Sequence, residues 1–346
     1  MFKHGQKPYI IAEIGANHNG DIELARRMID IAREAGCNAV KFQSWDEGLF
    51  SKTVYDENKF IGDDYRDRSD YTLRSIMTEF KVTREDLRDL ANYCTDIGID
   101  FSTTPFAPSQ VDDLAEFGAP FVKIASMDLV SDYMLRKAAD SGLPVVLSTG
   151  FGTMSEIDHA VRTLENANCQ ELVILHCLGL YPPPDDVVNL ANLEMLRTTF
   201  GYPVGFSDHT LGIDIPLAAM ALGAVVIEKH FTLDKEMFGW DHKMSADPDE
   251  IIAICAGRDR IHAAVGSARR VLSSAEIERS TEYRRSIVAA RPIAAGTEIS
   301  ANDIAYKRPG RGLSPNHDTL IVGRTAARDI QIDELIRFED LGRGEL

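Results

Sequence analysis

The sequence has few cysteines and no long apolar stretch. Five cysteines occur among 346 residues, an odd number, and no Cys-X-X-Cys pair is present. This pattern favours reduced thiols over a disulfide framework. The longest apolar run, 217–227, is too short to span a bilayer, and the first residues lack the apolar segment of a signal peptide. We therefore expect a cytoplasmic protein with no membrane partner.

Basic residues are also scarce relative to acidic ones. Lys and Arg number 37 against 54 Asp and Glu, which gives a formal net charge of −17. A nucleic-acid-binding surface needs an excess of cations, so we expect no nucleic-acid partner. A small anionic substrate stays possible, because a few local lysines can hold one inside an acidic protein.

What is present is a repeated alternation of short apolar runs with segments of helical spacing. Eight strand–helix units over about 250 residues are typical of an α/β fold of the (β/α)₈ TIM-barrel type. The predicted strands are Tyr9–Ile14, Ala39–Phe42, Asp100–Ser102, Phe121–Ile124, Val145–Leu147, Leu172–Leu175, Val204–Phe206 and Val225–Ile227.

The composition changes near Gly266. Residues 266–285 are polar and of mixed charge, and short apolar runs with frequent turns follow, at Val288–Ala290, at 293–296, at Ile304–Lys307 and at Ile321–Gly323. We predict a barrel over 1–265, a linker with a helix over 266–285, and a small, mainly β module over 286–346.

Polar residues follow or end nearly every predicted strand. The active sites of TIM barrels form at the C-terminal ends of the strands, so these residues are expected to meet there. The alternative is that strand ends simply meet water. The residues are Glu13, Lys41, Gln43, Thr103, Lys123, Ser126, Ser148, His176, Ser207, His209, Glu228 and His230.

Two lysines and a hydroxyl-rich turn predict a small anion site. Lys41 and Lys123 each end an apolar run, and Ser148-Thr149-Gly150 offers hydroxyl and backbone N–H groups before a helix. Surface salt bridges would be the alternative role of the lysines.

Two histidines at neighbouring strand ends, His209 and His230, predict a divalent metal site with open positions for water and substrate. Asp208 is expected to orient His209. The ligand types do not choose among Mn²⁺, Mg²⁺, Zn²⁺ and Fe²⁺, and a lone histidine is more often structural.

Two further features have open interpretations. His176 is either catalytic or a barrel-interior histidine bonded to a backbone carbonyl, and Cys177 is expected to be a small buried filler. The loop Gly239-Trp240-Asp241-His242 either lines a sugar pocket or caps the barrel.

Seven motifs in order, IAEIGANHNG, VKFQ, KIAS, LSTG, LHC…YP, FSDHTLG and VIEKHFTLD, resemble the N-acetylneuraminate synthase family, which includes legionaminic and pseudaminic acid synthases. The segment KRPGRGLSP resembles the antifreeze-like SAF module that ends those enzymes. The resemblance covers nearly the whole chain. It implies a transferase that condenses phosphoenolpyruvate with an N-acylated amino-sugar aldehyde, releases phosphate and uses Mn²⁺ or Mg²⁺. It also implies a domain-swapped homodimer.

The resemblance further implies a role for individual residues. Phosphoenolpyruvate would be held by Lys41, Lys123, Ser126, Ser148 and Ser207, and the metal by His209 and His230. Catalytic roles would fall to Glu13, His230 and Asp241, and sugar contacts to Gln43, Asp128, Tyr181, Asp241 and the partner's Arg308.

The chain departs from the family pattern around the sugar. Many members have Gly-Ser-Gly-Glu where this chain has Ala125-Ser126-Met127-Asp128, a polar pair where it has Leu178-Gly179-Leu180, and Gly-Pro-Asp where it has Gly239-Trp240-Asp241. None of these changes falls on the metal ligands. The resemblance therefore implies N-acetylmannosamine or a 2,4-diacetamido-trideoxyhexose as the acceptor, and apolar Met127 and Leu178 favour the latter.

Three other functions compete with this interpretation. A phospho-sugar synthase would share the barrel and phosphoenolpyruvate but would not be expected to carry the SAF module. A Schiff-base aldolase would use Lys123 or Lys229. A non-enzymatic glycan-binding protein is suggested only by the C-terminal module, and it leaves the strand-end residues unexplained.

Overall fold

The computed structural model describes residues 1–45, 49 and 77–342, so residues 46–48 and 50–76 of the predicted barrel and 343–346 of the predicted C-terminal module lie outside the described residues. The chain forms two compact units, Met1–Gly266 and Ser267–Leu346. Within the described residues, none of the helices combines the length and the apolar character needed to cross a bilayer.

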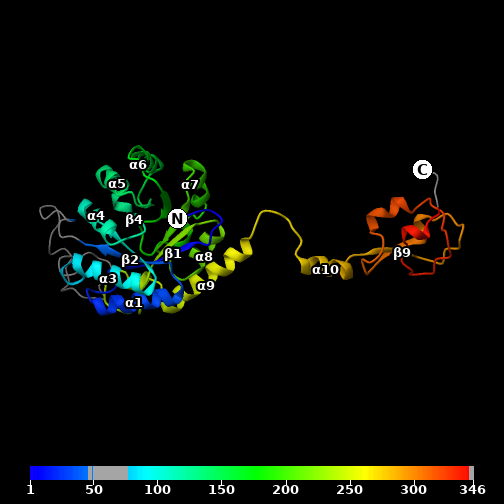
Figure 1. Cartoon of the computed structure of the whole chain (residues 1–346), viewed down its shortest axis with the longest axis horizontal. Helices are drawn as coiled ribbons and strands as arrows, with labels where there is room; N and C mark the ends of the chain where they lie inside the picture. The colour runs from blue at the N-terminus through cyan, green and yellow to red at the C-terminus, as the bar shows by residue number, and fades with distance from the viewer. Residues whose placement is uncertain (46–48, 50–76, 343–346) are drawn as a thin grey trace. The chain divides into compact units, whose positions relative to one another are not determined.

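The N-terminal unit contains eight parallel strands surrounded by helices (Figure 1). The strands are β1 Tyr9–Gly15, β2 Ala39–Ser44, β3 Asp100–Pro105, β4 Val122–Ile124, β5 Val145–Ser148, β6 Leu172–Cys177, β7 Val204–Asp208 and β8 Val226–His230. The helices are α1 Ile22–Ala35, α3 Arg84–Ile97, α4 Pro108–Glu116, α5 Asp132–Asp140, α6 Met154–Asn166, α7 Asn192–Phe200, α8 Asp214–Ala221 and α9 Pro248–Val265.

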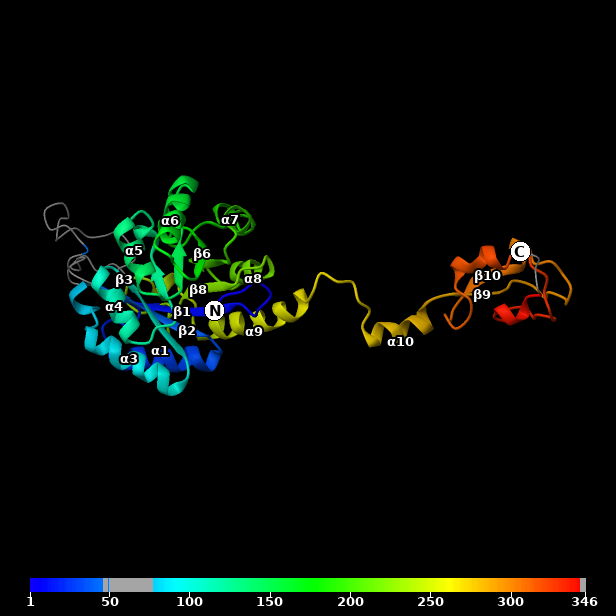
Figure 2. The same ribbon diagram turned by 45° about the horizontal axis from the view of Figure 1, so that its top comes forward.

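The strands pair in the order β3-β2-β1-β8-β7-β6-β5-β4. In the described residues the backbone ladder does not continue between β3 and β4, but Ser102 Oγ of β3 donates to the carbonyl oxygen of Phe121, beside β4, at 3.1 Å. The sheet is thus a nearly closed barrel, and the TIM-barrel prediction is confirmed. The turned view in Figure 2 shows the helices on the outside of the strands.

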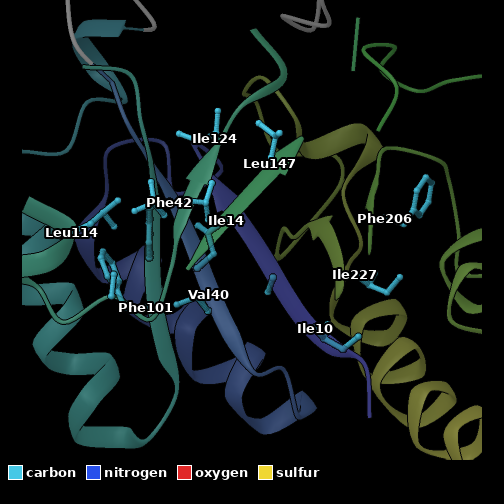
Figure 3. Close-up of a cluster of buried hydrophobic side chains, with 14 of the residues drawn as sticks. Ile10, Ile14, Val40, Phe42, Phe101, Leu114, Ile124, Leu147, Phe206 and Ile227 are labelled. Atoms are coloured by element: carbon cyan, nitrogen blue, oxygen red, sulfur yellow. The ribbon is translucent and has the colours of Figure 1, made fainter. Parts of the chain in front are cut away.

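Alternation along each strand divides the apolar residues into two layers. Ile11, Phe121, Val146 and Leu175 fill the barrel interior. Their neighbours along the strands face the helices, as Figure 3 shows for Ile10, Ile14, Val40, Phe42, Phe101, Ile124, Leu147, Phe206 and Ile227, together with Leu114 of helix α4. The strands are therefore apolar on both faces except near their C-terminal ends.

Helix α1 shows how the local sequence sets the element boundaries. Asp21 accepts hydrogen bonds from the backbone N–H groups of Glu23 and Leu24 at 2.9 and 3.1 Å and so caps the first turn. Gly36 ends the helix at φ +90°, a conformation that glycine adopts without strain.

Except for β4, which ends at Ile124 as predicted, the strands extend further toward their C-terminal ends than the apolar runs indicate. Lys41, Lys123, Ser148, Ser207 and His230 are the last residues of their strands or lie within them. The residues that carry these functional side chains therefore have their backbone fixed by the hydrogen bonds of the sheet.

The C-terminal unit has its own apolar core, which includes Ile287, Ile299 and Ile330. Helix α10 Ser274–Tyr283 precedes an antiparallel pair, β9 Ser286–Ala289 and β10 Ile304–Lys307. Ile293 forms only an isolated bridge to Ile330. Residues 321–323, predicted as a strand, instead follow a 3₁₀ turn at Pro315–Leu320.

Candidate functional site

A ring of buried polar side chains lines the C-terminal end of the barrel. These residues occupy the alternate strand positions that continue the interior apolar layer, so they point inward. The inward set, each no more than 7% exposed, is Glu13, Lys41, Lys123, Ser148, Ser207, Glu228 and His230.

Glu228 on β8 lies between two lysines. Its Oε1 is 3.4 Å from Lys123 Nζ, and its Oε2 is 3.7 Å from Lys41 Nζ. Ser207 Oγ donates to the same Oε1 at 2.9 Å. Lys41 Nζ also contacts Glu13 Oε2 and donates to Thr104 Oγ1 at 2.7 Å. Two lysines, two carboxylates and two hydroxyls are thus buried together at this end of the barrel.

Burial sets the ionisation of this cluster. The pKa of Lys41 is lowered to about 7, chiefly because the ammonium is desolvated; Glu228 opposes this effect and Lys123 adds to it. Burial alone would raise the pKa of Glu228, but Lys123 and Lys41 outweigh it and the pKa is lowered. An anion bound here would compete with Glu228 for the two lysines.

Two of the predicted serines, Ser148 and Ser126, lie on the β5 side of the lysine–carboxylate cluster. Ser148 Oγ is buried without a hydrogen-bond partner. Ser126 Oγ accepts a bond from Gly150 N at 3.0 Å, and a Cβ on Gly150 would lie 2.6 Å from that oxygen. Only glycine allows this approach without displacing Ser126. A buried hydroxyl left without a partner is a feature that a bound anion would satisfy.

His209 and His230 lie together, with their ring centroids 5.5 Å apart. Tyr181 stacks on His209 at 4.1 Å. Burial lowers the pKa of His209 to about 4 and also lowers the pKa of His230. Both imidazoles are therefore neutral at pH 7, the form that binds metals.

The donors around these histidines fit a divalent cation. His230 Nδ1 is buried without a hydrogen-bond partner, and Asp241 Oδ2 lies 3.8 Å from it. Within the described residues no three His, Cys, Asp or Glu side chains form a closed metal cluster. Two imidazoles with a carboxylate nearby leave positions for water and substrate, as catalytic metal sites do.

Asp208 does not orient His209, contrary to the sequence prediction. Adjacent strand residues point to opposite faces, so Asp208 turns outward and accepts bonds from Lys229 Nζ at 2.7 Å and Thr210 N at 2.8 Å. His209 Nδ1 bonds instead to the carbonyl oxygen of Leu178 at 2.9 Å. Lys229 is therefore engaged outside the barrel and cannot serve as a Schiff-base lysine there.

His176 also faces away from the barrel interior. Its Nε2 donates to the carbonyl oxygen of Val188 at 2.7 Å, and its ring packs on Phe206. This resolves the open question about His176 in favour of a structural role. Cys177 is buried, as expected.

The loop 239–242 is anchored by His242, and it reaches the site through Asp241, which lies beside His230, and through Trp240. His242 is buried and bonds to Thr232 Oγ1 at 2.7 Å and to Asn19 Oδ1 at 3.2 Å, which anchors the loop. Trp240 packs on Trp45, with ring centroids 4.7 Å apart. Trp45 Nε1 in turn donates to Gln43 Oε1 at 2.9 Å and orients that predicted sugar contact.

The remaining predicted residues differ in exposure. Met127 and Tyr181 are 57% and 56% exposed, whereas Asp128 is half-buried and its pKa is raised by burial. Arg308 lies in the C-terminal unit, exposed, with its guanidinium 5.0 Å from the Tyr283 ring centroid. It is thus held against α10 within its own unit.

The sequence prediction placed Glu228 among the strand-end residues without a specific role, and it did not include Thr104. Glu228 stands two residues before His230, and Thr104 is the inward neighbour of Lys41 across β2 and β3. Strand alternation alone could have assigned both to the inward face.

The chain was compared with known proteins. The NeuB family model matches residues 28–270, and the SAF domain model matches 284–342. The N,N'-diacetyllegionaminic acid synthase of Campylobacter jejuni is 37% identical, covering 96% of this chain and 99% of its own; that of Legionella pneumophila is 34% identical, covering 96% and 94%. A Leptospira borgpetersenii N-acetylneuraminic acid synthetase, crystallised with citrate, has a TM-score of 0.70 and 33% identity, covering 80% of this chain and 90% of that one. With these full-length matches, this chain belongs to the NeuB family and is an enzyme of the synthase class.

Proposed function

We propose that this enzyme condenses phosphoenolpyruvate with an N-acylated amino-sugar aldehyde, releases phosphate and forms a nonulosonic acid. The observation that carries the proposal is the juxtaposition of Lys41, Lys123 and Glu228 with the His209–His230 pair at one barrel mouth. The first group suits an anion, and the second suits a cation that activates a carbonyl. The relatives' names support the same reaction class.

Phosphoenolpyruvate would bind at the anion subsite and replace the contacts that Lys41 and Lys123 make with Glu228. Lys41 and Lys123 would donate to phosphate or carboxylate oxygens, because charge-assisted bonds are the stronger kind. Ser148 Oγ, which has no partner now, would gain one. Ser126 is already fixed by Gly150, so it would add a positioned hydroxyl.

His209 and His230 would hold the divalent cation, Mn²⁺ or Mg²⁺, with Asp241 beside them. When bound, the cation supplies a Lewis acid that polarises the acceptor carbonyl. Leu178, through its carbonyl, fixes the His209 ring so that Nε2 is available.

Glu13 is the residue best placed to move a proton. Both carboxylate oxygens are buried without a hydrogen-bond partner, and Oε2 contacts Lys41 Nζ. Glu13 would take a proton from the water that adds to phosphoenolpyruvate, because a buried base acts without competition from solvent.

The acceptor we propose is a 2,4-diacetamido-trideoxyhexose. This sugar has fewer hydroxyl groups than N-acetylmannosamine. That difference matches the apolar residues that this chain has at two positions near the expected sugar site, the exposed Met127 and the half-buried Leu178. The two relatives named for N,N'-diacetyllegionaminic acid support this choice. A swapped homodimer in the cytoplasm, with Arg308 reaching the partner's barrel, completes the proposal.

The test is phosphate release from phosphoenolpyruvate across a panel of amino sugars, with mass spectrometry of each product. The expected result is a product whose mass equals the masses of the two substrates and one water molecule, less the mass of the phosphate that is released. Borohydride treatment during turnover tests the aldolase alternative. In that case borohydride would reduce a Schiff base between Lys123 and the sugar or pyruvate, and the adduct would stay attached to the enzyme. No phosphate release with any acceptor, in the presence of Mn²⁺ or Mg²⁺, would overturn the proposal.

A further inference from the structure

Cys37 and Cys255 bring their sulfur atoms within 3.7 Å of each other. Both are free thiols. Cys37 follows the glycine that ends α1, and Cys255 lies in α9, so the pair connects the first helix of the barrel to its last. Cys37 also precedes the start of β2, which places the pair at the barrel end opposite the candidate site.

The backbone around the pair is fixed by a neighbouring arginine. Arg258 of α9 donates from Nη1 to the carbonyl oxygen of Gly36 at 3.1 Å and to Asn38 Oδ1 at 3.0 Å. These two acceptors flank Cys37 in the sequence. Arg258 therefore holds the segment that carries Cys37 against the helix that carries Cys255, and the two thiols stay neighbours.

The two sulfurs are chemically unequal. Cys255 is buried, and its pKa is lowered by the hydrogen bond with Cys37 and by the charge of Arg258. Cys37 is half-buried, and its pKa is raised by the same hydrogen bond and by burial. Cys37 is thus the more accessible sulfur, and the charge of Arg258 acts on both thiols to favour the thiolate, the nucleophilic form.

We propose that Cys37 and Cys255 form a reversible intramolecular disulfide when the enzyme meets hydrogen peroxide. A disulfide has a sulfur–sulfur distance of about 2.0 Å, so the sulfurs must approach by less than about 2 Å, which side-chain rotation can supply. The bond joins positions 218 residues apart and ties the first strand–helix unit to the last helix.

The chemistry balances in two steps. Peroxide transfers one oxygen atom to the accessible Cys37 sulfur, which becomes a sulfenic acid as one water forms. The Cys255 thiolate then attacks the Cys37 sulfur, the sulfur–oxygen bond breaks, and the departing hydroxide takes a proton to give a second water. Two thiols have lost two electrons, and peroxide has been reduced to water. A dithiol reductant reverses the bond by thiol–disulfide exchange.

The test is peptide mapping of the full chain. The reduced enzyme is treated with peroxide, its remaining thiols are blocked, and it is digested with trypsin without reductant. We expect the peptides 34–41 and 244–258 to appear as one cross-linked species that dithiothreitol separates. Titratable thiols should fall from five to three, because one bond uses two. The melting temperature should rise by several degrees, because the bond restricts the unfolded chain.

Two variants complete the test. Cys255→Ala should lose both the cross-link and the melting shift. Cys169→Ser, which removes a half-buried thiol that donates to the carbonyl oxygen of Glu171, should behave as the wild type. Oxidation of Cys37 to sulfinic acid without the 34–41 to 244–258 link, or a link between two chains instead, would overturn the proposal. The result is independent of the proposed reaction, because it is measured without substrate.

Discussion

The carbonyl oxygen of Leu178 accepts a hydrogen bond from Nδ1 of His209 at 2.9 Å. A carbonyl oxygen has no proton to give, so the proton of the neutral ring resides on Nδ1 and Nε2 keeps its lone pair. His230 Nδ1 is buried and unpartnered nearby. The protein thus presents an imidazole lone pair in a fixed direction before any metal arrives.

Metal dependence follows from this arrangement. A strong chelator should abolish synthesis, and Mn²⁺ or Mg²⁺ should restore it, because the acceptor carbonyl needs a Lewis acid. His209→Ala and His230→Ala should each weaken Mn²⁺ binding, measured by calorimetry, by at least about tenfold. His159→Ala, an exposed histidine paired with Asp132, is the matched control and should bind Mn²⁺ normally. Full activity after rigorous chelation would contradict the metal assignment.

The lysine pair predicts a selective loss of phosphoenolpyruvate affinity. Lys41→Ala and Lys123→Ala should each raise its KM about 10- to 100-fold, since each removes a charge-assisted contact of roughly 1.5–3 kcal/mol, while the sugar KM changes much less. Lys137→Ala, which removes a surface partner of Asp112, should leave both KM values unchanged.

Each lysine variant also leaves Glu228 with less compensating charge, so Glu228→Gln should be combined with it to recover stability. A rise in the sugar KM with an unchanged phosphoenolpyruvate KM would mean that the two subsites are exchanged.

Acceptor choice is predicted to depend on residues 127 and 128. Met127→Gly combined with Asp128→Glu should shift kcat/KM toward N-acetylmannosamine, because the change removes exposed apolar bulk and lengthens a carboxylate. The wild type should prefer the 2,4-diacetamido-trideoxy sugar. Initial rates with both sugars at matched concentrations measure the shift. A wild-type preference for N-acetylmannosamine would reject the acceptor proposal and leave the reaction class intact.

His18 should make the enzyme less stable in mild acid. Burial lowers its pKa to about 4, and its Nδ1 accepts a bond from Gly20 N at 2.9 Å. In the unfolded chain the pKa returns to about 6.5, so between these values the unfolded state binds the proton and stability falls as the pH is lowered. From pH 7 to pH 5 the loss should be about 2 kcal/mol.

Denaturant unfolding of the wild type and of His18→Gln at several pH values measures this loss. The glutamine can accept the same bond but does not titrate, so the difference between the two curves isolates His18. His159→Gln, at an exposed position, serves as the control. Parallel curves for wild type and His18→Gln would show that His18 is not the responsible group.

Subunit exchange tests the shared-site proposal for Arg308. His209→Ala and Arg308→Ala chains, each nearly inactive, are unfolded and refolded together. If Arg308 acts on the partner's barrel, each mixed dimer contains one intact site, and random pairing should restore about a quarter of wild-type sites. If Arg308 acts within its own chain, every site has one lesion. No recovery in a mixed dimer, verified by two different affinity tags, would exclude the shared site.

The barrel could be predicted from the sequence because each of its eight buried strands coincides with a short apolar run. Its view of the site is less complete for two physical reasons. Asp208 ends β7 with its side chain outside the barrel, whereas His209, the next residue, turns toward the site, so proximity in the chain misled the assignment. The orienting partner of His209 is a backbone carbonyl, and its position depends on the path of a loop rather than on the identity of Leu178.

The interruption between β3 and β4 gives the barrel a seam. Lys123 stands on β4 at one side, and Lys41 stands on β2, which reaches the seam through β3 at the other side. Along the backbone ladder the two lysines are almost as far apart as the sheet allows, although both lie near Glu228. An anion bound by both lysines would bridge the two sides of this seam. Substrate binding would therefore stabilise the barrel at the place where its backbone ladder is interrupted.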